Sequence, residues 1–219
     1  MPVRGLLDSE LEQINDDVIR MGDRVEEAIR RSVESLLEQD PELAEQVIRD
    51  DQIINQLRFD IEDACFTLLA TQQPTAIDLR TTVTALNIIT DLERIGDHAK
   101  GIGQIVVRMG GQDLSVTLPK IPRMAEAVCD MLNTVLDAFV RKDAPAAQRV
   151  NEMDDQVDHM YREVFESIIQ RMISREYNVR KGMNLLFAAH NLERIGDRIT
   201  NIGERIVFMV TGVMSELNL

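Results

Sequence analysis

The heptapeptides DLERIGD (residues 91–97) and NLERIGD (residues 191–197) share six consecutive residues and lie 100 positions apart. A second match precedes them, because EQDPELAEQV (38–47) aligns with RKDAPAAQRV (141–150) at an offset of 103. The offset falls from 103 to 100 between these two matches, which indicates that a loop between them is shorter in the second copy. Self-similarity at a fixed spacing is typical of a duplicated structural unit, so we predict two copies of one unit of about 100 residues.

Apolar residues follow the period of a helix around both heptapeptides. Within 75–109 and 178–214 they recur at alternating spacings of three and four residues, which is the pattern of long helices packed side by side at shallow angles. The positions are Ala85, Ile88, Leu92, Ile95, Ala99, Ile102, Val106 and Met109, then Leu185, Ala188, Leu192, Ile195, Ile199, Ile202, Ile206 and Met209. Strand-like alternation extends nowhere over a useful length. The sequence therefore predicts an all-α fold.

Residues that begin or end helices divide the chain into six segments. In EQDPEL, Asp40 is placed as an N-cap and Pro41 at the first helical position. Thr75 and Asp78 are spaced as a capping box, and 110–122 (GGQDLSVTLPKIP) is the longest stretch without a helical pattern, hence a linker. We expect two tandem three-helix bundles, 1–112 and 113–219, with helices over 8–39, 41–71, 75–109, 121–141, 144–173 and 178–214.

The charge balance restricts the classes of partner. Acidic residues number 38 against 24 lysines and arginines, which gives a formal net charge of −14. Nucleic acids bind basic surfaces, so no nucleic-acid partner is expected, whereas cations and basic protein surfaces remain open. Cys65 and Cys129 lack CxxC spacing, which favours reduced, buried thiols in a cytoplasmic protein. Because no signal peptide and no apolar run of ~18 residues is found, we expect a membrane to be reached only through a partner.

The repeated heptapeptide places a pair of acids on one helix face. Glu93 and Asp97 are four residues apart, as are Glu193 and Asp197, so both carboxylates of a pair point the same way. The apolar seam assigns these acids to the opposite side of the helix, and they are not expected in the core. Two like charges at this spacing destabilise a helix by ~0.2–0.5 kcal/mol, so we expect a compensating interaction.

A second pair of oxygen-bearing side chains occurs in the preceding helix of each unit: Asp51 with Asn55, then Asp154 with Asp158. If neighbouring helices bring the pairs together, four such side chains converge on one patch. Carboxylates a few Å apart repel by ~1 kcal/mol per pair in water, and a bound cation reverses this repulsion. Oxygen ligands suit hard ions such as Mg²⁺, Mn²⁺, Ca²⁺ or iron. A metal site and a solvated acidic face both remain open.

Glycines interrupt the same helices. Gly96 and Gly103 lie seven residues apart in one copy, and Gly196 and Gly203 in the other. A glycine inside a helix costs about 1 kcal/mol relative to alanine. We therefore expect a neighbouring backbone to approach closely at these positions.

The doubled LERIGD string, together with QPTAIDLR (73–80) and VLDAFVRKD (135–143), resembles the PhoU family. The resemblance covers nearly the whole chain and implies two similar three-helix bundles related by a pseudo-twofold axis. In some members, E(D)xxxD motif pairs hold multinuclear iron or zinc clusters; Mg²⁺ or Mn²⁺ also suits the ligands. By position, the resemblance implies a first metal site of Asp51, Asn55, Glu93 and Asp97 and a second of Asp154, Asp158, Glu193 and Asp197. Because Asn55 is neutral, we expect the second site to bind metal more tightly.

The resemblance also implies a function. PhoU-like proteins are cytoplasmic, non-enzymatic negative regulators that couple a phosphate ABC transporter to a membrane sensor histidine kinase and repress phosphate-starvation genes when phosphate is plentiful. The implied partners are the ATPase subunit of the transporter and the kinase, and the sequence leaves a homo-oligomer open. Two alternatives remain: a metal-free helical scaffold and a multinuclear carboxylate enzyme.

The three histidines weaken the enzyme alternative. No Glu-x-x-His occurs, since Ile95, Gln156 and Phe187 precede them by three residues, and a ferritin-like di-iron site needs that motif. His98 follows the first acidic pair and is interpreted as a surface histidine, with an accessory ligand as the alternative. His159 and His190 are interpreted as incidental.

Overall fold

The computed structural model of the chain describes residues 2–110 and 120–213. Over these residues it consists of helices without a strand: α1 (Pro2–Glu38), α2 (Pro41–Gln72), α3 (Ala76–Met109), α4 (Lys120–Arg141), α5 (Ala144–Ile173) and α6 (Val179–Thr211). The predicted helices and the all-α class are confirmed, although α1 begins at Pro2 rather than at residue 8. Most of the predicted linker, and with it the predicted division at residue 112, lies outside the described residues. That division stays a prediction.

Proline and aspartate begin the second helix of each unit. The Asp40 carboxylate accepts hydrogen bonds from the backbone N–H groups of Glu42 (2.9 Å) and Leu43 (3.0 Å), and Pro41 opens α2. Asp143 caps α5 in the same way, and its Oδ1 accepts from Ala146 at 2.9 Å. These contacts satisfy backbone donors that a helix start leaves without partners. The capping box predicted at the start of α3 is wrong, because the N-cap Thr75 makes no side-chain capping bond.

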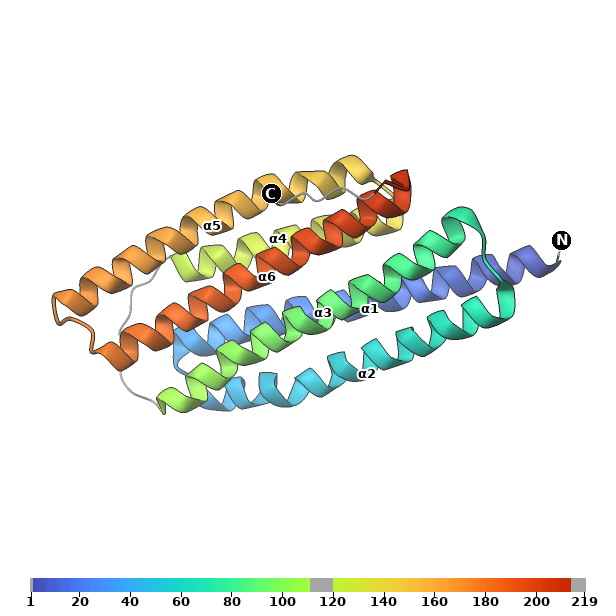
Figure 1. Ribbon diagram of the computed structural model, residues 1–219. Helices are drawn as coiled ribbons and strands as arrows, with labels where there is room; N and C mark the ends of the chain where they lie inside the picture. Colours follow the sequence, from blue (N-terminus) through green and yellow to red (C-terminus); the bar gives the residue numbers. More distant parts are fainter. Residues whose placement is uncertain (1, 111–119, 214–219) are drawn as a thin grey trace.

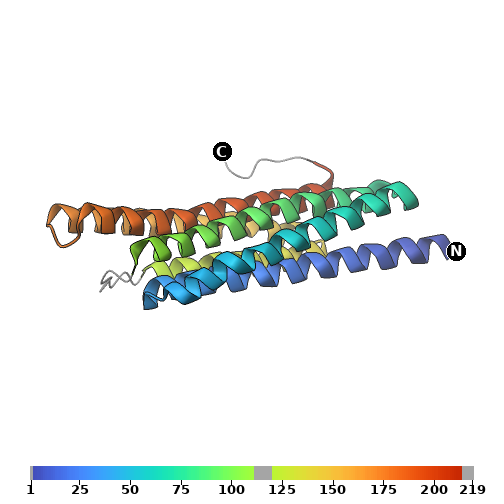
Figure 2. The same cartoon turned by 90° about the horizontal axis from the view of Figure 1, so that it is seen from below.

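The helices form two groups of three that lie against each other. Helices α1, α2 and α3 contact one another, and so do α4, α5 and α6. Helix α3 packs along α6 and α1 packs along α4, so these four lie centrally and α2 and α5 lie on opposite outer sides (Figure 1). All six run roughly parallel to one long axis, as the rotated view also shows (Figure 2). Helix α3 thus has neighbours on several sides, and the exposure of its acidic residues depends on which helix covers their side.

The predicted apolar seam lies in the core. All sixteen seam positions of α3 and α6 are buried, and Leu92 and Leu192 inside the repeated string are fully so. Burying one such side chain stabilises the fold by about 1.5–3 kcal/mol. Cys65 and Cys129 are buried as predicted, and burial raises the pKa of each thiol to about 12. No helix in the described ranges combines the length and hydropathy of a membrane span.

Glycines bring the outer helices close to the central ones, as the sequence predicted. A methyl group at Gly103 would lie 3.1 Å from the carbonyl oxygen of Ala44 on α2. At Gly203 it would lie 2.9 Å from the carbonyl oxygen of Ala147 on α5. The missing side chains let two backbones approach where a Cβ atom would collide. The same packing holds the acidic pairs of α2 and α5 against those of α3 and α6.

Candidate metal centre

The eight residues of the two predicted sites form two clusters. The first cluster (Asp51, Asn55, Glu93 and Asp97) lies between α2 and α3, and the second cluster (Asp154, Asp158, Glu193 and Asp197) lies between α5 and α6. Asp51 is only 4% exposed and Asp154 only 8%. The interpretation of these acids as a uniformly solvated face is therefore wrong. An outer helix covers the side of α3 or α6 that lies opposite the seam.

An internal cation pairs with the buried carboxylate of the first cluster. The Lys100 ammonium donates to Asp51 Oδ2 at 2.7 Å and lies 3.8 Å from Asp97 Oδ1. The side-chain amide of Asn55 donates to the same Asp51 oxygen at 3.1 Å. The hydrogen bond to Asp51 raises the pKa of Lys100. Arg94 adds a second positive charge, 3.5 Å from Glu93 and 3.3 Å from Asp97.

The second cluster lacks an equivalent of Lys100. Thr200 occupies the corresponding position, and its hydroxyl donates to the backbone carbonyl of Asp197 at 2.7 Å. Asp154 Oδ1 is buried against Gly196 and accepts no hydrogen bond from the residues that the structure describes. A buried carboxylate oxygen without a donor is costly, by about 1–3 kcal/mol or more for a charged group. This oxygen therefore marks a position where a positive partner would be stabilising.

Burial and mutual repulsion act on the carboxylates of the second cluster. Burial first, then the charges of Asp158, Asp197 and Glu193, raise the pKa of Asp154 to about 7. Burial and the charge of Asp197 also raise the pKa of Asp158 and of Glu193. The nearby bases lie at the rim: Arg194 is 2.8 Å from Asp197, and His190 Nδ1 is 3.1 Å from Glu193 Oε2. In the described ranges, neither base forms an ion pair with Asp154.

The two clusters differ in their fit to a metal ion. As the side chains stand, no three Asp, Glu, His or Cys residues in the described part of the chain converge closely enough to hold a metal ion. In the second cluster, Asp158 is exposed, Glu193 and Asp197 are half-buried, and the charges of all three act on Asp154, whose Oδ1 has no donor among the described residues. An all-oxygen donor set with surplus negative charge fits a hard cation. The first cluster does not fit in this state, because Lys100 already contacts its buried carboxylate.

The raised pKa of Asp154 predicts a pH-dependent stability in chelator. The folded pKa of about 7 lies above the unfolded value of 3.8, so the folded state binds more protons between them and stability falls as pH rises through this window. Asp154→Asn removes this contribution. Its unfolding free energy relative to that of the unsubstituted protein should rise by about 2–3 kcal/mol between pH 5 and pH 8. Urea denaturation with EDTA measures this difference, and a constant difference across the range would contradict the prediction.

Sequence reasoning missed Lys100 and the position of His190. Lys100 lies three residues after Asp97 on the same helix face, and comparison with Thr200 in the other copy would have marked the difference. His190 was interpreted as incidental, but it lies three residues before Glu193 and contacts its carboxylate. His159 is an exposed side chain whose Nε2 lies 3.8 Å from Glu163.

A pair of equivalent contacts joins the two units along α3 and α6. His98 Nδ1 lies 3.0 Å from the side-chain oxygen of Asn191, and Arg198 lies 3.4 Å from Asp91. These positions correspond to each other in the repeat, so one contact is a hydrogen bond and its counterpart an ion pair. His98 is therefore not a lone surface histidine. Burial lowers its pKa, and the Asn191 hydrogen bond opposes this effect.

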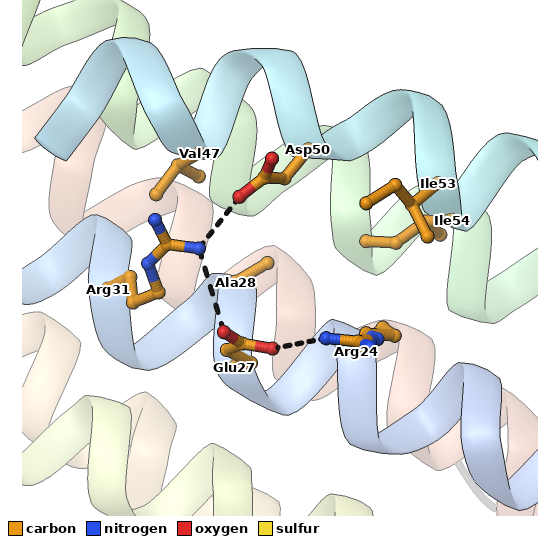
Figure 3. A pocket seen from close by; sticks show the side chains of 8 residues that line it. All are labelled: Arg24, Glu27, Ala28, Arg31, Val47, Asp50, Ile53 and Ile54. Atoms are coloured by element: carbon orange, nitrogen blue, oxygen red, sulfur yellow. Dashed lines mark hydrogen bonds and ion pairs between the residues drawn. The ribbon is translucent and has the colours of Figure 1, made fainter.

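A small pocket between α1 and α2 contains two arginines (Figure 3). Arg31 lies 2.7 Å from Asp50 and 3.6 Å from Glu27, and Arg24 lies 3.0 Å from Glu27. Both guanidinium groups are thus paired with carboxylates. The pocket therefore offers no surplus positive charge for an anion such as phosphate.

Comparison with known proteins supports the duplication and the fold. The family model described as PhoU domain matches residues 18–106 and 121–206, one match in each three-helix group. The chain is 36% identical to the phosphate-specific transport system accessory protein PhoU homolog of Clostridium acetobutylicum, over 98% of this chain and 99% of that protein. It is 34% identical to the phosphate-specific transport system accessory protein PhoU of Escherichia coli, over 96% of this chain and 87% of that protein.

Two crystal structures have the same fold. The phosphate transport system regulatory protein PhoU from Streptococcus pneumoniae superimposes with a TM-score of 0.89 at 31% identity, covering 96% of this chain and 99% of that one. PhoU from Pseudomonas aeruginosa gives a TM-score of 0.86 at 32% identity, covering 94% and 99%. The likeness therefore extends over both units and their mutual arrangement.

Proposed function

The chain belongs to the PhoU family, and from this premise we propose that it is a non-enzymatic negative regulator of phosphate uptake and of phosphate-starvation signalling. The observation that carries the proposal is the match along almost the whole chain to proteins named as accessory or regulatory proteins of phosphate transport. Activity of this kind requires binding surfaces and a state that can change, rather than a catalytic pocket.

The proposed partners are the ATPase subunit of a phosphate ABC transporter and the cytoplasmic part of its sensor histidine kinase. A net charge of −14 suits docking on basic surfaces of such partners, because complementary charge accelerates and orients association. We place the protein in the cytoplasm, where both partners present soluble domains. Contact with the membrane is then indirect.

Metal binding at the second cluster is part of the proposal. Asp154, Asp158, Glu193 and Asp197 would hold an iron, zinc, manganese or magnesium ion, or a small cluster of such ions. The ion would supply positive charge against which these carboxylates no longer repel one another. Support comes from Asp154 Oδ1, which has no hydrogen-bond donor among the residues that the structure describes, and from the raised pKa of that residue. Neutralised carboxylates would fix α5 against α6 and so define a surface for partners.

Complementation tests the regulatory role. In a bacterium whose own PhoU gene is deleted, a reporter driven by a phosphate-starvation promoter stays active even in high phosphate. Expression of this chain is expected to return the reporter to its repressed level in high phosphate and to leave it active in low phosphate. Immunoblotting confirms equal protein levels, and the host's own PhoU serves as the positive control.

Two results would contradict this role. If the reporter remains active while the chain accumulates in folded form, the chain is not a regulator of this pathway in that host. If repression occurs equally in low and high phosphate, the chain represses without coupling to phosphate. Loss of co-purification with the transporter ATPase, together with turnover of a substrate, would instead favour the metalloenzyme alternative.

A further inference from the structure

The two carboxylate clusters occupy equivalent places in the two repeats but carry different internal charges. We infer that the ammonium group of Lys100 takes the place of a metal ion in the first cluster, so that only the second cluster, between α5 and α6, takes a hard divalent or ferric cation. This inference rests on the proposed metal binding. In the first repeat the acids are then paired with the Lys100 side chain, and in the second repeat they are paired with a metal ion.

The contacts of Asp51 carry the first part of the inference. This carboxylate is buried and accepts from both Lys100 (2.7 Å) and Asn55 (3.1 Å). A metal ion at the same place would have to displace the ammonium and would be repelled by it while it remained nearby. Lys100 also contacts Asp97, the opposite member of the cluster. The amine therefore bridges α2 and α3, as a cation shared by their acids would.

The contacts of Asp154 carry the second part. It is 8% exposed, and its Oδ1 accepts no hydrogen bond within the described ranges. Thr200 stands in the position of Lys100, and its hydroxyl donates to the backbone carbonyl of Asp197. Asp158 stands where the first cluster has the amide of Asn55, which adds a negative charge and removes a donor. The second cluster thus has an acceptor directed between the helices without the amine that satisfies its counterpart.

Removal of metal is expected to affect the two repeats differently. Removing metal leaves the Lys100–Asp51 contact between α2 and α3 intact. Between α5 and α6, the carboxylates lose the positive charge of the metal and repel one another. Metal availability is therefore expected to change the packing of α5 while leaving that of α2 unchanged. Hydrogen exchange with and without Zn²⁺ should show increased protection in 144–173 and little change in 41–72.

Exchanging the two side chains between the repeats tests the inference. The full-length protein and its variants are stripped with EDTA, dialysed against Zn²⁺ or Mn²⁺, and analysed for bound metal by plasma mass spectrometry. We expect Lys100→Thr to double the bound metal and Thr200→Lys to abolish it. Arg108→Thr removes a positive charge from the exposed surface of α3 and is the matched control, with unchanged metal content.

Two further variants keep the test decisive if Thr200→Lys does not fold. Asp154→Asn is expected to remove the bound metal, whereas Asp51→Asn should leave it unchanged. If each of these variants loses half of the metal, both clusters bind it, and the inference is overturned while the metal proposal stands. If the unsubstituted protein and Lys100→Thr both bind none, the metal proposal and the inference fail together.

Discussion

Replacing Gly203 with valine is expected to lower the free energy of unfolding by about 2–3 kcal/mol, because the new side chain enters a backbone contact that cannot widen locally. A Cβ atom at this position lies 2.9 Å from the carbonyl oxygen of Ala147, closer than such atoms approach in folded proteins. Helix α5 must then move away from α6, and the buried seam loses contacts along its length. Urea denaturation followed by circular dichroism measures the change.

Gly5→Val is the matched control for this prediction. Gly5 also lies inside a helix, but no atom of the described residues beyond its own helix turn lies within 4 Å of a Cβ built there. Its replacement should change the stability by less than about 0.5 kcal/mol, as is usual for exposed positions. Because valine has a higher helix propensity than glycine, equal losses in both variants would show that valine destabilises the fold without a collision at its Cβ atom. The close approach of α5 to α6 would then not explain Gly203.

Replacing Asp154 with asparagine is expected to lower the affinity for Zn²⁺ or Mn²⁺ by at least about 100-fold. Groups that merely orient metal ligands contribute 10–100-fold to affinity, and a ligand itself contributes at least as much. Asparagine keeps the shape of the side chain but removes the charge that α5 places in the interior. Isothermal titration of the chelator-treated protein measures the affinity.

Asp155→Asn is the control, because it removes one negative charge from the next residue on the exposed side of α5. Its affinity should stay within about threefold of the unsubstituted value, a difference typical of screened surface charges. If both variants lose affinity equally, the metal is attracted by the general acidity of the helix. A defined site at Asp154 would then be excluded.

The helices and their packing could be predicted because the information lies in local periodicity. Alternating spacings of three and four around Leu92 and Leu192 are sufficient to define a buried stripe, whatever the neighbours are. Asp40 with Pro41 marks a helix start through contacts within one turn, and the structure confirms it. Gly103 and Gly203 could be interpreted correctly because a glycine inside a helix costs about 1 kcal/mol relative to alanine, and its recurrence at equivalent places in both copies indicates a packing reason.

The environment of the acids could not be predicted in the same way, since it depends on which helix covers the other side of α3 and α6. A single seam assigns Glu93 and Glu193 to its opposite side, but α2 and α5 cover that side and bury Asp51 and Asp154. The ion pair of Lys100 with Asp51 joins residues from two helices, and no pattern within one helix reveals it. His98 was misinterpreted for the same reason, because its partner Asn191 belongs to the other repeat.

Anomalous X-ray diffraction from crystals of the full-length protein grown with Mn²⁺ or Zn²⁺ tests the account most directly. We predict an anomalous peak between α5 and α6, within coordination distance of the Asp154 carboxylate, and none beside Lys100 between α2 and α3. A peak beside Asp51, or the absence of a peak at Asp154 with metal bound elsewhere, would contradict the assignment of the metal to the second cluster.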